Sequence, residues 1–462
     1  MKLRSRFALF IAKLSIPLLK LTRHTGTNFP GEIALRICPD FLAQIDKPKK
    51  IYMVTGTVGK TTVSNMLSDL LKELGSRVLN NSEGSNINSG IATTLIKGVT
   101  FFGRSRYDIA VLELDERHSR TVCRYISPDC LLITNITQDS IMRHAHPEYI
   151  ASILDAYIPK DTLLVLNADN LHSCFIAKDN KRVTFSLAPR EDDVAYNTDM
   201  LSPINLCPQC ASPLVYDFMR GAELGRATCP ACGFSSPAPD FVAKNIDFTK
   251  ASMLIATKDE HGQSREYSFP IINDSVFNIY NEVSVLALLL AEGYEATQLQ
   301  QAIKKIGITK KRFAYVEING TRIRKMSAKG RGSYGCSRLF DAILSDPSDK
   351  EIILLLNSEA SMDGWAEDTC WLYDCAFEKL TDPSIKRIVI AGESAADYLL
   401  RLRLAGIDES KIVQAETALE APDKLLYFPN DSIYSIVELD LQVLAETLFE
   451  KIINNVKSGG VR

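Results

Sequence analysis

Thr55–Thr62 read TGTVGKTT, and this stretch decides the fold. It follows a short apolar run, Ile51–Val54, and opens a segment whose apolar residues recur at helical spacing up to Gly75. A strand, a glycine turn and a helix in this order aim backbone N–H groups at phosphates. Lys60 would then neutralise the β- and γ-phosphates, and Thr61 is a candidate ligand of Mg²⁺. The stretch therefore predicts a site for a nucleoside triphosphate.

The composition is that of a folded protein with several domains. The chain has 462 residues, of which 46% are hydrophobic and 24% charged, and this length suggests about three domains with their own cores. A net charge of -3 gives no reason to expect nucleic acid as the main partner. Eleven cysteines, an odd count, without a convincing secretory signal favour a reducing cytosol. We therefore expect a cytoplasmic protein whose paired cysteines indicate a metal rather than disulfides.

Basic and apolar residues interleave in the N-terminal segment 1–48, where no acidic residue precedes Glu32. Lys13 and Pro17 interrupt the apolar run, which is shorter than the about 20 residues needed to span a bilayer. Two arrangements stay open for this segment. A basic amphipathic helix would rest on anionic lipid at the inner face of the membrane, or the helix would pack on the neighbouring domain.

Strand and helix patterns alternate from about residue 50 to 200, which predicts a parallel sheet with crossover helices. An insertion rich in Cys, Pro, Gly and Ser occupies about 203–240, and we expect the α/β pattern to resume after it. A change of pattern near 312–325 suggests a boundary. The predicted architecture is α/β throughout, with an ATP-binding domain over 49–312 that holds the insertion and a smaller, Rossmann-like α/β domain over 313–462.

Four cysteines in the insertion have the spacing of a metal site. They form two C-x₂-C pairs separated by eighteen residues: Cys207, Cys210, Cys229 and Cys232. Two such knuckles complete a tetrahedron, and four thiolates leave no open position for water, so the ion should be structural rather than catalytic. Zinc is the first choice, and an iron centre of the same geometry stays open.

Carboxylates and amides recur where the predicted strands end. Glu113 follows the apolar run Ile109–Leu112, and a carboxylate in that place faces the ligand crevice of an open sheet. Because Mg²⁺ takes oxygen ligands, Glu113 is our second candidate for the magnesium site. Asn135, Asp139 and Asp169 follow other strands in the same way.

The short TGTxGKTT loop resembles that of the Mur ligase and folylpolyglutamate synthase superfamily, which makes amide bonds through acyl phosphates. Other stretches, together with the inserted Cys₄ ribbon, resemble the MurT family, the Mur-ligase-like subunits of lipid II isoglutaminyl synthase. These stretches are Asn81–Asn86 (NSEGSN), Val111–Glu116 (VLELDE), Phe277–Asn281 (FNIYN), Asp363–Gly364 and Asp368–Asp374 (DTCWLYD). Val58 departs from the family, which usually has asparagine there.

The resemblance implies an ATP-dependent carbon–nitrogen ligase. ATP would phosphorylate the α-carboxylate of D-glutamate in the stem peptide of lipid II, and ammonia would convert the acyl phosphate to D-isoglutamine. Lys60 and Glu113 would take part in catalysis. Nucleotide contacts would come from Thr57, Gly59, Lys60, Thr61, Thr62, Asn281 and Arg312.

The resemblance also implies a partner, a class I cysteine glutaminase of the GatD type that supplies the ammonia. Asp368 would complete the Cys-His-Asp triad of that partner. Asp363 is the alternative, because Trp365–Glu367 replace a single residue of the family's motif.

The sequence independently places the ammonia source in another chain. All six histidines lie at or before His261, and no G-x-C-x-G elbow occurs, so the tail offers no base for a glutaminase cysteine. Two other functions stay open. A stand-alone Mur or folylpolyglutamate-type ligase would add an amino acid without glutamine, and a zinc-ribbon regulatory ATPase would bind ATP without forming an amide.

Overall fold

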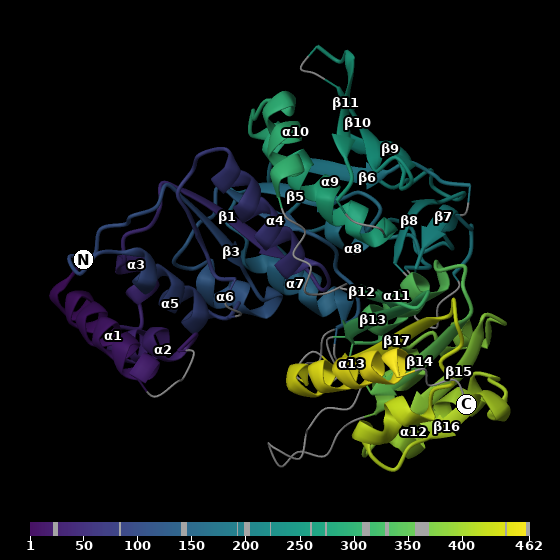
Figure 1. Ribbon diagram of the computed structural model, residues 1–462. Helices are drawn as coiled ribbons and strands as arrows, with labels where there is room; N and C mark the ends of the chain where they lie inside the picture. The colour runs from purple at the N-terminus through teal and green to yellow at the C-terminus, as the bar shows by residue number, and fades with distance from the viewer. Residues whose placement is uncertain are drawn as a thin grey trace.

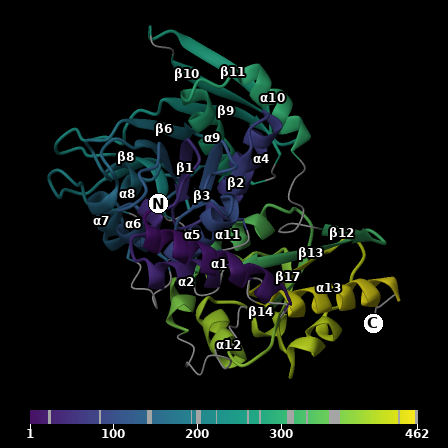
Figure 2. The same cartoon turned by 90° about the vertical axis from the view of Figure 1, so that its left-hand side faces the viewer.

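Two sheets, one above the other, organise the molecule in this computed structural model (Figure 1). It describes residues 1–21, 26–82, 85–139, 146–191, 193–197, 204–221, 223–258, 261–272, 275–306, 315–328, 332–355, 369–438 and 441–458. The view turned by 90° likewise separates the larger upper sheet from the smaller lower one (Figure 2).

The larger sheet has the strand order β11-β10-β9-β6-β5-β4-β1-β3-β2. Its parallel part confirms the predicted alternation of strands and helices, with every pair from β2 to β6 parallel. The parallel strands are β1 (Lys50–Thr55), β2 (Val78–Asn80), β3 (Ile109–Glu113), β4 (Cys130–Ile133), β5 (Leu163–Asn167) and β6 (Arg182–Leu187). Their carboxyl ends meet at one edge of the sheet. The predicted phosphate loop, Thr55–Thr62, lies at this edge.

The α/β pattern resumes after the insertion, as expected, but the strands come together and do not alternate with helices. Three strands precede the next helix, namely β9 (Phe241–Asp247), β10 (Ser252–Lys258) and β11 (Ser264–Pro270), and β10 pairs antiparallel with both of its neighbours. Only residues 248–251 separate β9 from β10, too few for the crossover that a parallel pair requires. The outer strand β11 is largely exposed and polar, so it lacks the apolar run that marks a buried strand.

Helices cover both faces of the larger sheet, because alternate strand residues point to opposite sides. Tyr52 and Val54 join the core under α4 (Lys60–Glu73), α9 (Val276–Ala291) and α10 (Ala296–Lys305). Ile51 and Met53 join the core on the other side. The helices there are α2 (Phe29–Ile37), α3 (Phe41–Gln44), α5 (Asn88–Gly98), α6 (Ser119–Val122) and α7 (Pro147–Tyr157).

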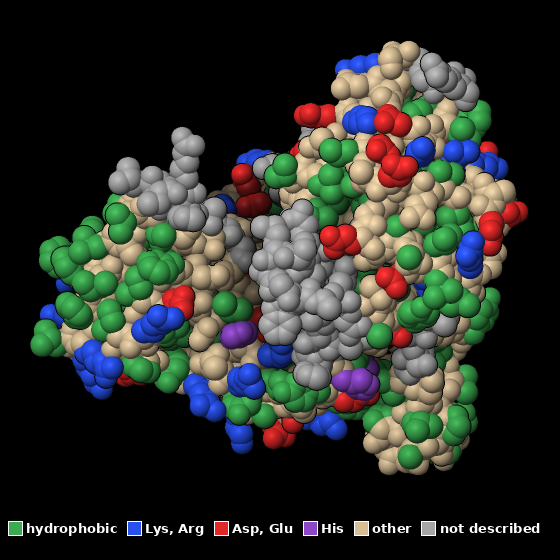
Figure 3. Space-filling model, turned by 90° about the horizontal axis from the view of Figure 1, so that it is seen from below, with side chains coloured by type: hydrophobic (Ala, Val, Ile, Leu, Met, Phe, Trp, Pro, Cys, Tyr) green, Lys and Arg blue, Asp and Glu red, His purple; other side chains and the backbone are tan. Residues whose placement is uncertain are grey.

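The N-terminal helix α1 (Leu3–Leu21) packs on this second layer through Ala8, Leu9 and Ala12, which are buried. Packing on the neighbouring domain, one of the two predicted arrangements, is therefore observed. The opposite face of α1 is exposed, and Figure 3 shows hydrophobic side chains gathered at that end of the molecule. Within the described part of the chain, no helix is both long and apolar enough to cross a membrane.

The insertion forms a two-stranded antiparallel ribbon of β7 (Val215–Arg220) and β8 (Leu224–Thr228). It follows the short helix α8 (Leu171–Cys174) and strand β6, and the chain then re-enters the large sheet at β9. The ribbon has a small core of its own, to which Phe234 and two of the four predicted metal-ligating cysteines contribute.

The smaller sheet has the order β12-β13-β17-β14-β15-β16 and is parallel except for the edge strand β12. This confirms a smaller C-terminal α/β domain. Its strands are β12 (Tyr315–Ile318), β13 (Thr321–Ala328), β14 (Lys350–Leu355), β15 (Ile385–Ile390), β16 (Ile412–Gln414) and β17 (Ser432–Glu438). Helices α11 (Ser333–Leu344) and α12 (Ala395–Leu404) cover one face, and α13 (Gln442–Lys457) covers the other.

Candidate functional site

The predicted phosphate loop joins β1 to α4, and two of its glycines are required by their surroundings. Gly59 has φ +92°, and a Cβ there would lie 2.4 Å from Oδ1 of Asn281 on α9. Gly56 has φ +125°, and its Cβ would lie 2.3 Å from Oγ1 of Thr134. Only glycine fits both the backbone and the space. The close approach brings Asn281, predicted to contact nucleotide, directly beside the loop.

Lys60 extends its ammonium group over the loop. Its Nζ donates to the carbonyl oxygens of Gly56 and Thr57 and to Oε1 of Glu116, at 2.8 Å from that carboxylate. Both side chains of this ion pair are almost fully buried. Burial acts most strongly and lowers the pKa of Lys60, but the charge and hydrogen bond of Glu116 and the charges of Glu113 and Asp139 together outweigh it, so the pKa is raised above its ordinary value. The lysine therefore carries a cation at the place where a bound phosphate would lie.

The end of β4 holds the loop in its shape. Asn135 accepts a hydrogen bond from the Val58 N–H at 3.1 Å and donates to the Val58 carbonyl at 3.0 Å. Thr57 donates through Oγ1 to the Thr137 carbonyl and accepts from the Thr137 N–H, at 3.1 and 3.0 Å. These backbone contacts make the loop conformation independent of the side chain at position 58.

Glu113 and Glu116 lie at the same edge in different roles. Asn81 binds the backbone of Glu113 on both sides, at 2.7 and 2.9 Å, and Asn86 donates to its Oε1 at 3.0 Å. The half-buried carboxylate of Glu113 is thus oriented but bears no ion pair among the described residues. Glu116, which we did not select from the sequence, is the carboxylate that pairs with Lys60 and also accepts from the Gly56 N–H. The sequence feature that could have identified Glu116 is its place in the acidic run that follows the apolar part of β3.

The structure brings most of the predicted nucleotide and magnesium residues together. Thr61 and Thr62 occupy the first turn of α4, half-buried, directly after Lys60. Glu113 ends the strand that pairs with β1 beside the loop. Arg312, Asp363 and Asp368 lie outside the described residues.

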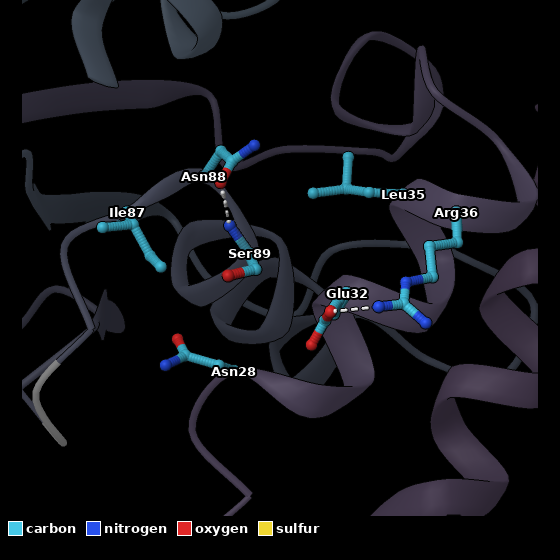
Figure 4. A pocket seen from close by; sticks show the side chains of 7 residues that line it. All are labelled: Asn28, Glu32, Leu35, Arg36, Ile87, Asn88 and Ser89. Atoms are coloured by element: carbon cyan, nitrogen blue, oxygen red, sulfur yellow. Dashed lines mark hydrogen bonds and ion pairs between the residues drawn. The ribbon is translucent and has the colours of Figure 1, made fainter. Parts of the chain in front are cut away.

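A pocket of about 490 Å³ lies between α2 and the start of α5 (Figure 4). Its walls come from α2 and from the start of α5, and its lining residues are Asn28, Glu32, Leu35, Arg36, Ile87, Asn88 and Ser89. Arg36 forms an ion pair with Glu32 at 2.8 Å along α2, and the Asn88 side chain accepts from the Ser89 N–H at 2.9 Å in the first turn of α5. Ile87 of the pocket wall directly follows Asn86, the residue that donates to Glu113.

The four cysteines of the ribbon converge as predicted. All their sulfur atoms lie within 4.8 Å of one another, with Sγ–Sγ distances of 3.6 Å for Cys207–Cys232 and 3.5 Å for Cys210–Cys229. A tetrahedral zinc ion with Zn–S bonds of about 2.3 Å places its sulfurs about 3.8 Å apart. The four donors therefore fit zinc.

The two knuckles repeat one backbone design. In the first, Ala211 donates its N–H to the Cys207 carbonyl at 2.9 Å with φ +57°; in the second, Gly233 donates to the Cys229 carbonyl at 3.0 Å with φ +75°. A left-handed residue after each second cysteine turns the chain so that both thiols of a pair face the same point.

The ribbon is tied to the nucleotide side of the core by buried polar groups. Arg220, at the end of β7, donates to the Tyr280 hydroxyl at 2.7 Å, and that hydroxyl donates to Asp169 at 2.7 Å. Arg220 also pairs with Asp193. Tyr280 precedes Asn281 in α9, so the ribbon supports the helix that presents Asn281 to the loop.

The C-terminal domain meets the same region. Tyr334 of α11 packs against Val58 of the phosphate loop, and the Arg338 guanidinium lies 4.8 Å from the ring centroid of Phe277 on α9. Gln138 donates to Asp374 at 2.9 Å, which connects the loop after β4 with the segment that follows the predicted triad residue. Val58, a residue of the loop itself, thus contributes to a contact between the two domains.

Comparisons with known proteins agree with this architecture. The model of the Mur ligase middle domain matches residues 54–202, and that of the MurT ligase C-terminal domain matches residues 332–438. The chain is 30% identical over 397 residues to the lipid II isoglutaminyl synthase (glutamine-hydrolyzing) subunit MurT of Streptococcus pneumoniae, covering 84% of each chain. It is 27% identical over 418 residues to the subunit of the same name from Staphylococcus aureus, covering 90% of this chain and 91% of that one.

Solved structures share the fold at lower identity. A pseudomurein peptide ligase type C from Methanothermus fervidus superposes with a TM-score of 0.64 at 18% identity, covering 90% of this chain and 81% of that one. MurF from Acinetobacter baumannii superposes with a TM-score of 0.60 at 15% identity, covering 92% and 81%. The Mur ligase fold therefore extends over most of the chain.

Proposed function

Because this chain belongs to the MurT family of Mur-type, ATP-dependent ligases, we propose that it amidates lipid II through an acyl phosphate. The acceptor is the α-carboxylate of D-glutamate in the stem peptide, and the product is D-isoglutamine. The observation that carries the proposal is the phosphate loop, with the buried Lys60 cation above it and Asn281 beside it. The place of action is the cytoplasmic face of the membrane, where a lipid-linked precursor is accessible.

The chemistry needs activation, because a carboxylate is a poor electrophile. One carboxylate oxygen attacks the γ-phosphorus of ATP, ADP leaves, and the phosphorylated oxygen becomes a leaving group. Ammonia then attacks the carbonyl carbon, phosphate departs with that oxygen, and the nitrogen loses a proton to give the amide. Lys60 and the N–H groups of the loop stabilise the charge on the transferred phosphoryl group.

Thr61 and Glu113 would hold Mg²⁺, which would neutralise the phosphates. Glu113 suits this role because Asn81 and Asn86 orient it and no described cation pairs with it. Thr57, Gly59 and Thr62 would line the phosphates, and Arg312 would add a contact from the segment leading to the C-terminal domain. Zinc in the Cys₄ site would fix the ribbon, and through Arg220 and Tyr280 it would support Asn281.

We propose that the pocket between α2 and α5 binds the stem peptide of lipid II. Its wall residue Ile87 follows Asn86, which orients Glu113, and this connection supports a stem peptide bound with its carboxylate towards the loop. Ser89→Trp, which fills the pocket from the start of α5, should weaken lipid II use. ATP binding should stay unchanged, because the pocket that Ser89 lines contains no residue of the phosphate loop.

The proposed partner is a class I cysteine glutaminase of the GatD type that binds the C-terminal domain. Asp368 would orient the partner's catalytic histidine and stabilise its protonated form. The contact from Gln138 to Asp374 supports communication between the two sites, since Asp374 ends the same sequence motif.

The test is glutamine-dependent ADP release with lipid II and the co-purifying glutaminase. Asp368→Asn should abolish the use of glutamine and spare the use of free ammonia, while Asp363→Asn serves as its matched comparison. Lys60→Ala should abolish ADP release with either nitrogen donor. Release of ADP with an amino acid and no glutamine would favour the stand-alone ligase. ATP binding without any amide product would favour the regulatory scaffold.

A further inference from the structure

We propose that the outer face of α1, together with the turn Phe101–Phe102, docks the protein on an anionic lipid bilayer. This surface contains no residue of the phosphate loop and takes no part in the proposed chemistry. We call this surface the N-terminal face. Its apolar side chains are Leu3, Phe7, Phe10, Leu14, Leu18, Phe101 and Phe102.

The helix presents two distinct faces. Ala8, Leu9 and Ala12 are at most 2% exposed and belong to the core beneath α1, so the orientation of the helix is fixed. The apolar residues on the other side have exposed fractions of 86% at Leu3, 57% at Phe7, 52% at Phe10, 48% at Leu14 and 63% at Leu18. At 100° per residue these five fall within about 80° of the helix circumference. A water-facing helix surface would be polar at these positions.

The turn extends the same surface. Gly103 closes it by donating its N–H to the Thr100 carbonyl at 2.9 Å, which leaves Phe102 94% and Phe101 68% exposed. A Cβ on Gly103, whose φ is +80°, would lie 2.6 Å from Sδ of Met1. The turn therefore abuts the start of α1. Aromatic side chains at an exposed turn tip are suited to the interface between head groups and acyl chains.

Basic residues border the apolar strip. Their positive charge favours an anionic partner. Lys2, Arg4 and Arg6 are exposed at the start of α1. Lys13 donates to the Val99 carbonyl at 2.7 Å and lies 5.3 Å from the ring centroid of Phe101. No acidic residue precedes Glu32 in the chain. A second copy would bring like charges together, whereas an anionic bilayer complements both the apolar strip and its basic border.

The position of this face leaves the rest of the molecule accessible. Helix α1 and the smaller sheet lie at opposite ends of the molecule (Figure 1), so a bilayer under α1 leaves the C-terminal domain free to bind a protein partner. Figure 3 shows the hydrophobic side chains at the α1 end with Lys and Arg side chains next to them. Helix α1 packs on α2, which lines the pocket of Figure 4, so a docked molecule holds that pocket near the lipid head groups.

The test is flotation of the full-length protein with vesicles of phosphatidylglycerol and phosphatidylcholine, without ATP or lipid II. We expect binding that requires phosphatidylglycerol and weakens with salt. Phe7→Ser/Phe10→Ser should reduce vesicle binding about tenfold or more. Lys2→Glu/Arg6→Glu should abolish the preference for the anionic lipid.

The matched control is Leu419→Ser/Val443→Ser, which removes exposed apolar side chains from the C-terminal domain and should leave vesicle binding unchanged. An unchanged melting temperature checks that each variant is folded. Equal binding of the Phe7/Phe10 variant and the wild type would overturn the proposal. So would a wild-type dimer in solution that this variant converts to a monomer. Amide formation on a water-soluble acceptor measures the proposed function separately, since it needs no membrane.

Discussion

The ion pair between Lys60 and Glu116 gives the sharpest test of the site. Glu116→Gln keeps the shape of the side chain and removes its charge, leaving the Lys60 cation buried without compensation. Both side chains are nearly inaccessible, with exposed fractions of 7% and 4%, so water cannot replace the lost partner. Breaking a buried pair from one side costs about 3–5 kcal/mol. At about 2 °C per kcal/mol for a unit of this size, the melting temperature should fall by about 6 °C or more.

The double variant Lys60→Met/Glu116→Gln should recover most of this loss, because no buried charge then remains. The assay is thermal unfolding of the wild type, both single variants and the double variant, read as a double-mutant cycle. Lys72→Met is the matched control: its ion pair with Asp69 lies on the same helix but is about half exposed, so its loss should cost under about 1 kcal/mol.

Bound ATP should change how the melting temperatures of the variants compare with that of the wild type. Phosphates supply the negative charge that Glu116→Gln removes, so saturating ATP should raise the melting temperature of this variant more than that of the wild type. It should not stabilise Lys60→Met to a comparable extent. Additive single effects, or equal nucleotide stabilisation of all variants, would refute the assignment of Lys60 as the phosphate-binding cation.

Three further predictions concern the loop, the ribbon and a buried carboxyl. Gly59→Ala should abolish ATP binding, measured by calorimetry. Gly75→Ala is its control, because Gly75 also has a positive φ (+91°) but a Cβ there would have nothing within 4 Å. This control should lower stability by only roughly 1–2 kcal/mol and keep ATP binding intact. Cys229→Ser should remove the zinc measured by mass spectrometry and lower the melting temperature, whereas the exposed Cys370→Ser should change neither. Burial raises the pKa of Glu223 to about 8, so the folded state binds an extra proton between the unfolded pKa near 4.3 and about pH 8. Stability should therefore fall as pH rises through this window, by up to about 1.4 kcal/mol per pH unit, and Glu223→Gln should flatten that dependence in urea unfolding.

The sequence predicted the parts of the fold that local patterns determine. The β1–loop–α4 unit and the neighbouring strand β3 follow from apolar periodicity and from turn chemistry, and the structure has them at the predicted places. The spacing of the four cysteines predicted that their sulfur atoms lie close together, as the ligands of one metal ion must. The antiparallel strands β9–β11 escaped prediction because the edge strand β11 is polar and its pairing is set by short connections rather than by its own residues.

The sequence predicted those site residues that belong to a motif. It did not predict the residues whose role depends on tertiary contacts. Glu113 and Glu116 are three residues apart in one acidic run, and only the turn after β3 determines which carboxylate reaches Lys60. Likewise, Arg220 of the insertion and Tyr280 of α9 lie 60 positions apart, and their hydrogen bond exists only in the folded chain. Distances of this kind follow from packing and not from sequence spacing.

In the proposed reaction, ATP activates a carboxylate of lipid II by transferring a phosphoryl group to it. The measurement uses lipid II whose D-glutamate α-carboxylate carries ¹⁸O in both oxygens, with the glutaminase partner, glutamine and ATP. Mass spectrometry of the phosphate released during amidation should then find one ¹⁸O atom per turnover, because the acyl phosphate takes its bridging oxygen from the carboxylate. Unlabelled phosphate, released at the same rate as the amide, would contradict the account.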